Sequence, residues 1–281
     1  MTTFALVATG EMGSALARAL VVAGHAVLTS TAGRSPRTAS RAAAAGAIAT
    51  TSMDATVDGA DVFLSVLPPD RAPALAEEVA AALKSTGRTL LYADCNAVSP
   101  ATSARVGEIV AGAGARYVDV GIIGFPSQPV LYASGEHAAE LVTLTAGALD
   151  VRDIGGANGR ASALKMCYAA FTKGTTALAT ELLVAAERLG VDAELRAELG
   201  ASAPDLLAIA ARSVPRMPPK AYRWIGEMEE IAATFEAAGL TPRMLLGAAD
   251  LYRLVEGAGL PADADLDEVL RRLAEAIAAG R

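Results

Sequence analysis

One lysine stands out among the residues whose chemistry could serve a reaction. The chain has four lysines against 20 arginines, and Lys165 lies near the start of a largely apolar stretch, residues 158–190. Tyr168 follows one helical turn later, on nearly the same face. Burial against apolar neighbours lowers the pKa of a lysine towards neutral pH, where the amine can give and take protons. The sequence therefore predicts that Lys165 is a general acid or base, with Tyr168 either assisting it or packing in the core.

The stretch that must position Lys165 has the pattern of one long helix. It contains no proline and one interior glycine, Gly174, and its apolar residues recur at three- and four-residue spacing. A helix of roughly 30 residues is about 45 Å long. Strand and helix patterns alternate before it, and only helix patterns follow it. We therefore expect an α/β Rossmann-type domain over residues 1–157 and an all-helical domain over residues 158–281, joined by this helix.

The N-terminus has the strand–turn–helix pattern of a dinucleotide-binding turn. Residues 3–8 read as a buried strand, and a glycine turn and a helix pattern follow. In the G-x-G-x-x-G pattern the three glycine places hold Ala8, Gly10 and Gly13. The second place lets the backbone approach a pyrophosphate, and the third allows close packing of helix on strand. A plain tight turn is the alternative, but we expect these residues to bind the cofactor: Gly10, Glu11, Met12 and Gly13.

The residues after the second strand, 25–30, indicate which cofactor. An NAD site carries an acidic residue near this position to hold the ribose 2′-hydroxyl. Residues 31–38 contain no acid and offer hydroxyls and arginines instead, among them Thr31, Arg34 and Ser35. Arginine can grip a phosphate bidentately, so these residues suit the 2′-phosphate of NADP. A solvated basic loop is the alternative, and we predict NADP rather than NAD.

Two further predicted strands, 61–69 and 89–96, end at the edge where open α/β sheets bind ligands. Leu67 and Pro68 are expected to flank a ribose of the cofactor. Asn96 can donate and accept hydrogen bonds there, or it can form an Asx turn before the next helix. A strand over 115–121, an uncharged loop and strand, and a last strand at 151–154 bring the total to about eight.

Composition excludes several classes of partner. A net charge of −7 and a pI near 5.0 argue against binding to nucleic acid or to an anionic membrane surface. Two cysteines give no disulfide framework, and two histidines give no metal cluster. The N-terminus lacks a basic leader, and no 18-residue apolar run is present. The expectation is a cytoplasmic enzyme that acts on a small molecule.

Taken together, these features resemble the β-hydroxyacid dehydrogenase and 6-phosphogluconate dehydrogenase superfamily over the whole chain. The resemblance lies in GEMG…AGH, in DCNAVSP after the fifth strand, in the glycine turn before Lys165 and in the long helix. GIIG, SALKMCYAAFTKG and PRMPPKAYRWIGEMEEIAATF are similar to an uncharacterised branch with a phosphogluconate-dehydrogenase-like C-terminal domain. The resemblance implies an NAD(P)-dependent enzyme, dimeric or larger, with its active site between the two domains. It also implies that the lysine is the catalytic acid/base, in a pattern whose first three places hold Gly159, Ala161 and Lys165.

Two departures from the family pattern bear on the substrate. Tyr168 and Ala169 stand where the pattern has an asparagine, and Ile123 stands where a serine helps to hold a substrate carboxylate. A site that contains Ile122, Ile123 and Gly124 is more apolar than a hydroxyacid requires. The prediction is a homodimeric NADP-dependent oxidoreductase that transfers a hydride between nicotinamide and a small alcohol or carbonyl. An imine reductase and a non-catalytic dinucleotide-binding sensor are the alternatives.

Overall fold

The computed structural model describes residues 1–31 and 35–280. The chain divides into two compact units, Met1–Met166 and Cys167–Arg281. The sequence places the boundary at residue 157, before helix α7 (Arg160–Leu189). The first turns of α7 lie in the first unit because they are bonded to its sheet, as described below.

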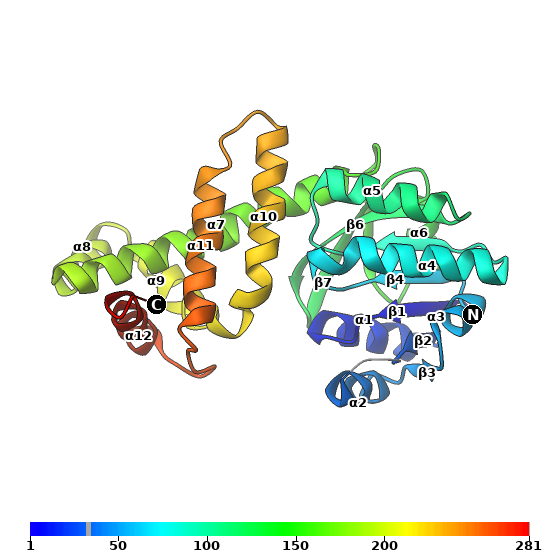
Figure 1. Ribbon diagram of the computed structural model, residues 1–281, viewed down its shortest axis with the longest axis horizontal. Coiled ribbons are helices and arrows are strands. Elements are labelled where there is room, and N and C mark those ends of the chain that lie inside the picture. The colour runs from blue at the N-terminus through cyan, green and yellow to red at the C-terminus, as the bar shows by residue number, and fades with distance from the viewer. Residues whose placement is uncertain (32–34, 281) are drawn as a thin grey trace. The chain divides into compact units, whose positions relative to one another are not determined.

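The first unit is built on an eight-stranded sheet with the order β3-β2-β1-β4-β5-β6-β7-β8. All neighbouring strands pair in parallel except β6 and β7, which are antiparallel. This sheet and the helices that follow it confirm the predicted Rossmann-type domain followed by a helical region (Figure 1). The strands are β1 (Thr3–Val7), β2 (Ala26–Ser30), β3 (Ile48–Thr50), β4 (Val62–Ser65), β5 (Leu91–Asp94), β6 (Arg116–Phe125), β7 (Gln128–Ser134) and β8 (Asp150–Asp153).

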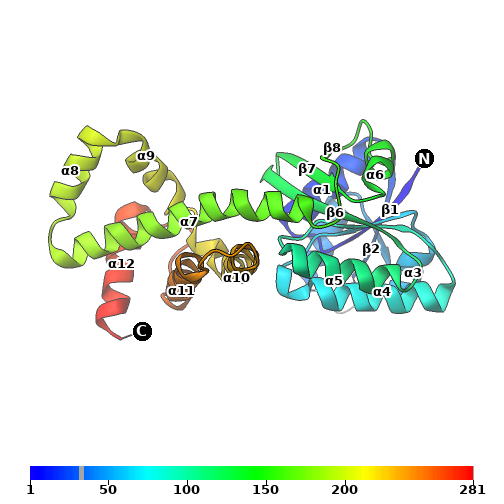
Figure 2. The ribbon, with the colours of Figure 1, turned by 90° about the horizontal axis from the view of Figure 1, so that it is seen from above.

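Helices cover both faces of this sheet, which explains why its central strands are apolar throughout. One face packs against α1 (Glu11–Val22) and α6 (Ala138–Leu144). The other packs against α3 (Met53–Asp58), α4 (Ala72–Thr86) and α5 (Pro100–Ala111), as Figure 2 shows for α4 and α5. The short helix α2 (Pro36–Ala44) lies next to β3.

The sheet order brings two predicted binding segments together. The order reverses at β1, since β2 and β3 lie on one side of it and β4 and β5 on the other. Ligands of open α/β sheets bind at this reversal, outside the carboxyl ends of the strands. The turns that follow β1 and β4 meet there, where the Val66 amide donates to the Val7 carbonyl over 2.9 Å.

The prediction of a loop after residue 121 is wrong. Strand β6 continues to Phe125, and only Pro126 and Ser127 separate it from β7, so residues 122–124 are paired strand residues. Gly124 has φ +106°, and a Cβ there would lie 2.8 Å from the Gln128 carbonyl oxygen. The uncharged stretch that was expected to form a loop is instead mostly strand, and Gly124 supplies the conformation that this hairpin needs next to Gln128.

The second unit is all helical, as predicted. Beyond α7 it contains α8 (Asp192–Ser202), α9 (Pro204–Ser213), α10 (Ala221–Ala237), α11 (Arg243–Gly257) and α12 (Leu266–Ala278). Helices α10 and α11 lie side by side, and Trp224 packs edge-on against Tyr252 with ring centroids 5.3 Å apart. Both helices hold α7 at one residue: Lys173 forms a 2.7 Å ion pair with Glu227, and its carbonyl accepts the Tyr252 hydroxyl over 2.6 Å. In the described part of the chain, no helix combines the length and hydropathy needed to cross a bilayer.

Candidate active site

The turn between β1 and α1 has the geometry of an anion-binding turn. Gly10 is the N-cap of α1, and no side chain among the described residues caps this helix. A Cβ at Gly10 would meet nothing within 4 Å, whereas a Cβ at Gly13 would lie 2.1 Å from the Ala8 carbonyl oxygen. Gly13 therefore lets α1 sit tightly on β1, and Gly10 leaves room before the helix's N–H groups. The turn fits a pyrophosphate, with Glu11 exposed and Met12 half-buried against the core.

A second loop is braced from inside the sheet. The Asn96 side chain is buried and accepts the Leu67 amide over 2.7 Å. Its own amide group donates to Ser65 over 2.8 Å and to Asp94 over 2.5 Å. The side-chain oxygen of Asn96 therefore holds the loop after β4. Leu67 is half-buried and packs against the core, and Pro68 is exposed at the start of a 3-10 turn.

The region expected to hold a 2′-phosphate is only partly described. Thr31 follows β2 and is half-buried, and Ser35 caps α2 by accepting the Thr38 amide over 3.3 Å. The Thr9 hydroxyl, in the turn after β1, donates to the Thr38 carbonyl over 2.8 Å, which ties the start of α2 to that turn. Arg34 lies outside the described residues.

Two buried aspartates, Asp94 of β5 and Asp119 of β6, pair with each other on neighbouring strands. Asp94 and Asp119 are joined through Tyr117 and Ser103: the tyrosine hydroxyl is 3.4 Å from Asp94 and 2.8 Å from Ser103, which donates to Asp119 over 3.0 Å. Burial raises the pKa of Asp94 to about 7, against hydrogen bonds from Asn96 that lower it, and the charge of Asp119 raises it further. Burial likewise raises the pKa of Tyr117. Asp94 can therefore hold a proton near neutral pH.

Asp119 anchors the start of α7. One oxygen of its buried carboxylate accepts the hydroxyls of Ser103 and Ser162, over 3.0 and 2.5 Å. The other accepts the Ser134 hydroxyl over 3.0 Å and the amides of Gly159 and Ser162, each over 2.9 Å. The first N–H groups of a helix have no partner within it, so a strand residue supplies the cap that α7 needs.

Lys165 comes next along the contact between α7 and β6. A Cβ at Gly121 would lie 2.6 Å from the Ala161 carbonyl oxygen and 3.0 Å from the Lys165 Cβ, so only glycine lets the helix approach this closely. The half-buried Lys165 ammonium donates to the Ile122 carbonyl oxygen. The lysine therefore lies at the carboxyl end of β6, on the sheet edge that carries the turns after β1, β4 and β5.

The other predicted substrate and catalytic residues differ in exposure. Ile122 belongs to the core, and the next residues along β6, Ile123 and Gly124, are half-buried and exposed. Tyr168 lies one turn after Lys165 in α7, with 46% of its surface exposed. No hydrogen bond joins its hydroxyl to the described part of the chain, and more than half of its surface is covered.

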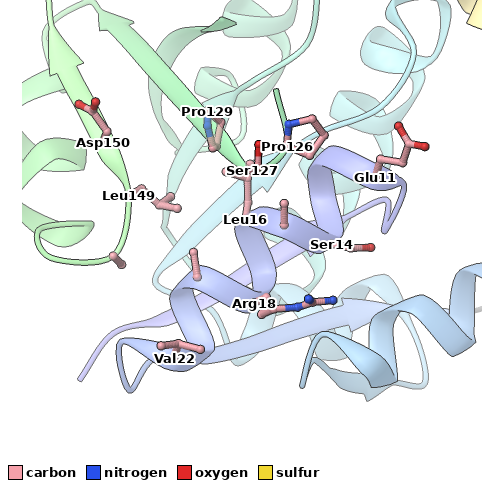
Figure 3. Close-up of a pocket in the computed structure, with 13 residues that line it drawn as sticks. Glu11, Ser14, Leu16, Arg18, Val22, Pro126, Ser127, Pro129, Leu149 and Asp150 are labelled. Carbon is pink, nitrogen blue, oxygen red and sulfur yellow. The ribbon is translucent and has the colours of Figure 1, made fainter. Parts of the chain in front are cut away.

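A groove of about 700 Å³ lies elsewhere in the first unit (Figure 3). It runs along α1 and is bordered by the β6–β7 hairpin at Pro126 and Pro129 and by Leu149 before β8. Of the predicted site residues that the structure describes, only Glu11 lines this groove, so the groove does not include the turn at Gly10.

The pH dependence of stability tests the environment of Asp94. Its pKa is raised, so the folded state keeps a proton between about pH 4 and pH 7 that the unfolded chain releases, and stability is lost as pH rises through this window. Asp94→Asn removes the titration. The variant's free energy of unfolding, relative to wild type, should rise with pH in this window by at most about 1.4 kcal/mol per pH unit.

Urea denaturation of both proteins between pH 4.5 and pH 8 measures this difference. Asp58→Asn is the matched control, because it removes a carboxylate from an exposed position. If the difference between Asp94→Asn and wild type changes no more with pH than the control's difference does, the pKa of Asp94 is not raised.

Comparisons with known proteins agree with this arrangement. Residues 3–128 match the family model of the NAD binding domain of 6-phosphogluconate dehydrogenase, and residues 186–255 match a domain of unknown function, DUF1932. An uncharacterised 28.5 kDa protein of Methanothermus fervidus is 29% identical over 140 residues, 50% of this chain and 53% of that protein. The chain thus matches about half the length of this curated relative.

Solved structures share the fold over nearly the whole chain. A conserved hypothetical protein from Sinorhizobium meliloti 1021 is 25% identical, with a TM-score of 0.71 and coverage of 98% of this chain and 97% of that one. A Mycobacterium tuberculosis 3-hydroxyisobutyrate dehydrogenase shares the fold at 23% identity, with a TM-score of 0.72 and coverage of 97% and 99%. A reductive aminase from Aspergillus terreus, in complex with NADPH, shares it at 21% identity, with a TM-score of 0.57 and full coverage of both chains.

The two family matches together span more than half of the chain, and they lie in the sheet unit and the helical unit respectively. The protein therefore belongs to the β-hydroxyacid dehydrogenase and 6-phosphogluconate dehydrogenase superfamily, in the branch that carries the DUF1932 domain.

Proposed function

We propose that the protein is an NADP-dependent oxidoreductase that transfers a hydride between nicotinamide and a small alcohol or carbonyl, with Lys165 as general acid/base. The observation that carries this proposal is the position of Lys165. Its ammonium lies at the carboxyl end of β6, held by the Ile122 carbonyl, on the edge of the sheet where the glycine turn and the braced Leu67 loop also end.

In this proposal the turn at Gly10 binds the cofactor and Lys165 transfers the proton. The glycine turn at Gly10 binds the pyrophosphate through backbone N–H groups, and bound nicotinamide supplies or accepts the hydride. An ammonium has three N–H donors. The Ile122 carbonyl takes one, which orients the group, and another can donate to a substrate oxygen as negative charge develops there. In the reverse direction the neutral amine takes the proton from the alcohol.

The residues beside Lys165 favour a substrate with an apolar portion. Ile123 and Gly124 offer no charge or side-chain hydrogen bond to a substrate. An imine would also suit such a site, and the fold shared with a reductive aminase supports that second candidate. NADPH consumption with a panel of hydroxyacids, small carbonyls and cyclic imines separates the two, and no consumption with tight cofactor binding would favour a sensor.

Removal of the lysine side chain tests the catalytic role. Lys165→Ala should lower turnover by roughly 10²–10⁴, the range for a positioned general acid, because no other group then supplies the proton. Cofactor affinity should barely change, since the phosphates are held at α1. Steady-state kinetics and cofactor titration measure the two effects separately.

Two further variants sharpen this test. Lys165→Arg should not restore turnover, because a guanidinium stays protonated and cannot cycle. Lys84→Ala is the control, since Lys84 is exposed on α4 and its loss should leave turnover unchanged. Near-normal turnover of Lys165→Ala with a much lower melting temperature would instead make the lysine structural.

Cofactor choice rests on the residues after β2. We expect NADPH to bind at least tenfold more tightly than NADH, about 1.4 kcal/mol, because Arg34 and its hydroxyl neighbours can hold the 2′-phosphate. Arg34→Ala should weaken NADPH binding and leave NADH binding as it is. Fluorescence titration of both cofactors decides the matter, and equal affinities in the wild type would refute the assignment.

We also propose that the enzyme is a homodimer formed through α7 and the helical unit. An apolar stripe on α7 is solvent-exposed at three-, four- and seven-residue spacing, with Phe171 71% and Leu189 76% exposed. Monomers rarely leave so long an apolar stripe in water. The stripe comprises Tyr168, Phe171, Leu178, Leu182 and Leu189.

Charged substitutions test the dimer. Phe171→Glu combined with Leu178→Glu should give a monomer at micromolar concentration, measured by light scattering, because two carboxylates would be buried without partners. Val22→Glu is the control, since Val22 is an equally exposed apolar residue on α1. A stable wild-type monomer at the same concentration would contradict the proposal.

A further inference from the structure

We propose that Asp119 is a positioning residue that acts through Lys165: its carboxylate fixes the first turn of α7 on β6 and so places the lysine ammonium at the sheet edge. The inference rests on the function proposed above. It concerns a side chain that lies out of reach of any bound molecule, since Asp119 is completely buried.

The residue before α7 is Gly159, which offers no side chain to cap the helix. Arg160 opens the helix, and Gly159 has φ +93°. The amides of Gly159 and Ser162 are bonded to Asp119, 40 and 43 residues earlier in the sequence. The Ala161 amide is bonded to the Ser134 hydroxyl over 3.0 Å, and that hydroxyl in turn donates to Asp119. Three of the four amides from Gly159 to Ser162 are thus held by one carboxylate and the serine hydroxyl bonded to it.

The contact between β6 and α7 sets the orientation of the helix as well as its position. Residues 119 and 121 of β6 point to the same face of the sheet, because side chains of a strand alternate. At position 119 the carboxylate accepts hydrogen bonds from the helix start. At Gly121 the absence of a side chain lets the strand backbone contact Ala161 and Lys165. Two points of contact along one strand fix both the position of the helix and its rotation about its own axis. The lysine then meets the carbonyl of the next residue, Ile122.

Lys165 depends on this support. Its side chain is flexible, and the bond to the Ile122 carbonyl fixes the ammonium only while the helix holds the Lys165 Cα within reach of β6. Errors of about 1 Å in the placement of a catalytic group can cost roughly 100-fold in rate. A small rotation of the first turn of α7 therefore changes turnover without touching the cofactor turn at α1.

The test compares three variants in the same buried network. Asp119→Asn keeps the shape of the side chain and replaces one acceptor oxygen by a donor. Ser162→Ala removes one bond to Asp119 and keeps the helix, which guards against a failure of Asp119→Asn to fold. Tyr117→Phe is the matched control, because Tyr117 is bonded to Ser103 and lies close to Asp94 but has no bond to α7.

In steady-state kinetics, Asp119→Asn should lower kcat roughly 10–100-fold and Ser162→Ala should lower it less, with the Kd for NADPH unchanged in both. Tyr117→Phe should lose stability and keep kcat within about twofold of wild type. In a Lys165→Ala background, Asp119→Asn should have almost no further effect on kcat, because the group it positions is gone. Equal losses in both backgrounds would overturn the inference.

A second readout needs no turnover. The chain has four lysines, so the spectrum of protein labelled with ¹³C at the lysine Cε is sparse, and Lys165→Ala identifies the Lys165 signal. Asp119→Asn and Ser162→Ala should shift that signal, Tyr117→Phe should not, and Lys173 in the helical unit should stay in place. A Lys165 signal unmoved by Asp119→Asn refutes the positioning role. Failure of the wild type to consume NADPH, with the signal shifted as expected, would instead refute only the proposed reaction.

Discussion

The bond between the Asp119 carboxylate and the start of α7 is the constraint on which the candidate site depends. A buried carboxylate is costly unless it is fully hydrogen-bonded, and the first N–H groups of a helix are costly unless they are capped. The bond between them satisfies both groups. Five donors surround Asp119, and two of them are amides at the start of α7. The positive end of the helix dipole adds to this attraction. The helix is consequently fixed on the sheet at the point from which Lys165 projects.

Two glycines serve the same physical purpose at the two places where we propose chemistry. Gly13 brings α1 onto β1 and Gly121 brings α7 onto β6, and a Cβ at either position would collide with a backbone oxygen. Because α1 packs closely on β1, the start of α1 lies at the sheet edge. Because α7 packs closely on β6, the Lys165 side chain in the second turn of α7 lies there too. Glycine at these two positions therefore allows the close approach of helix and strand on which the cofactor turn and the lysine both depend.

The fold was predictable because its signals are local. The alternation of strand and helix patterns, the glycine turn after residue 8 and the unbroken run over 158–190 each predict an element, and the handedness of such units leaves few topologies. The prediction of a loop directly after Gly121 was wrong because glycine and proline occur in loops and in tight turns alike, and here the turn follows Phe125. The anchoring role of Asp119 could not be predicted, because its partners at Gly159 and Ser162 are 40 and 43 residues away and local sequence patterns do not reveal such long-range contacts. The local signal for it is a polar residue in a buried strand, Asp119, followed two residues later by a glycine on the same face, Gly121.

The central claim is that Lys165 supplies the proton that accompanies hydride transfer. The most direct measurement is the rate of a single turnover, followed by the loss of NADPH absorbance in H₂O and in D₂O. The account predicts that the wild type reacts more slowly in D₂O and that the residual reaction of Lys165→Ala loses this dependence on the solvent. The same ratio of rates in both proteins would contradict it, since the proton would then come from elsewhere.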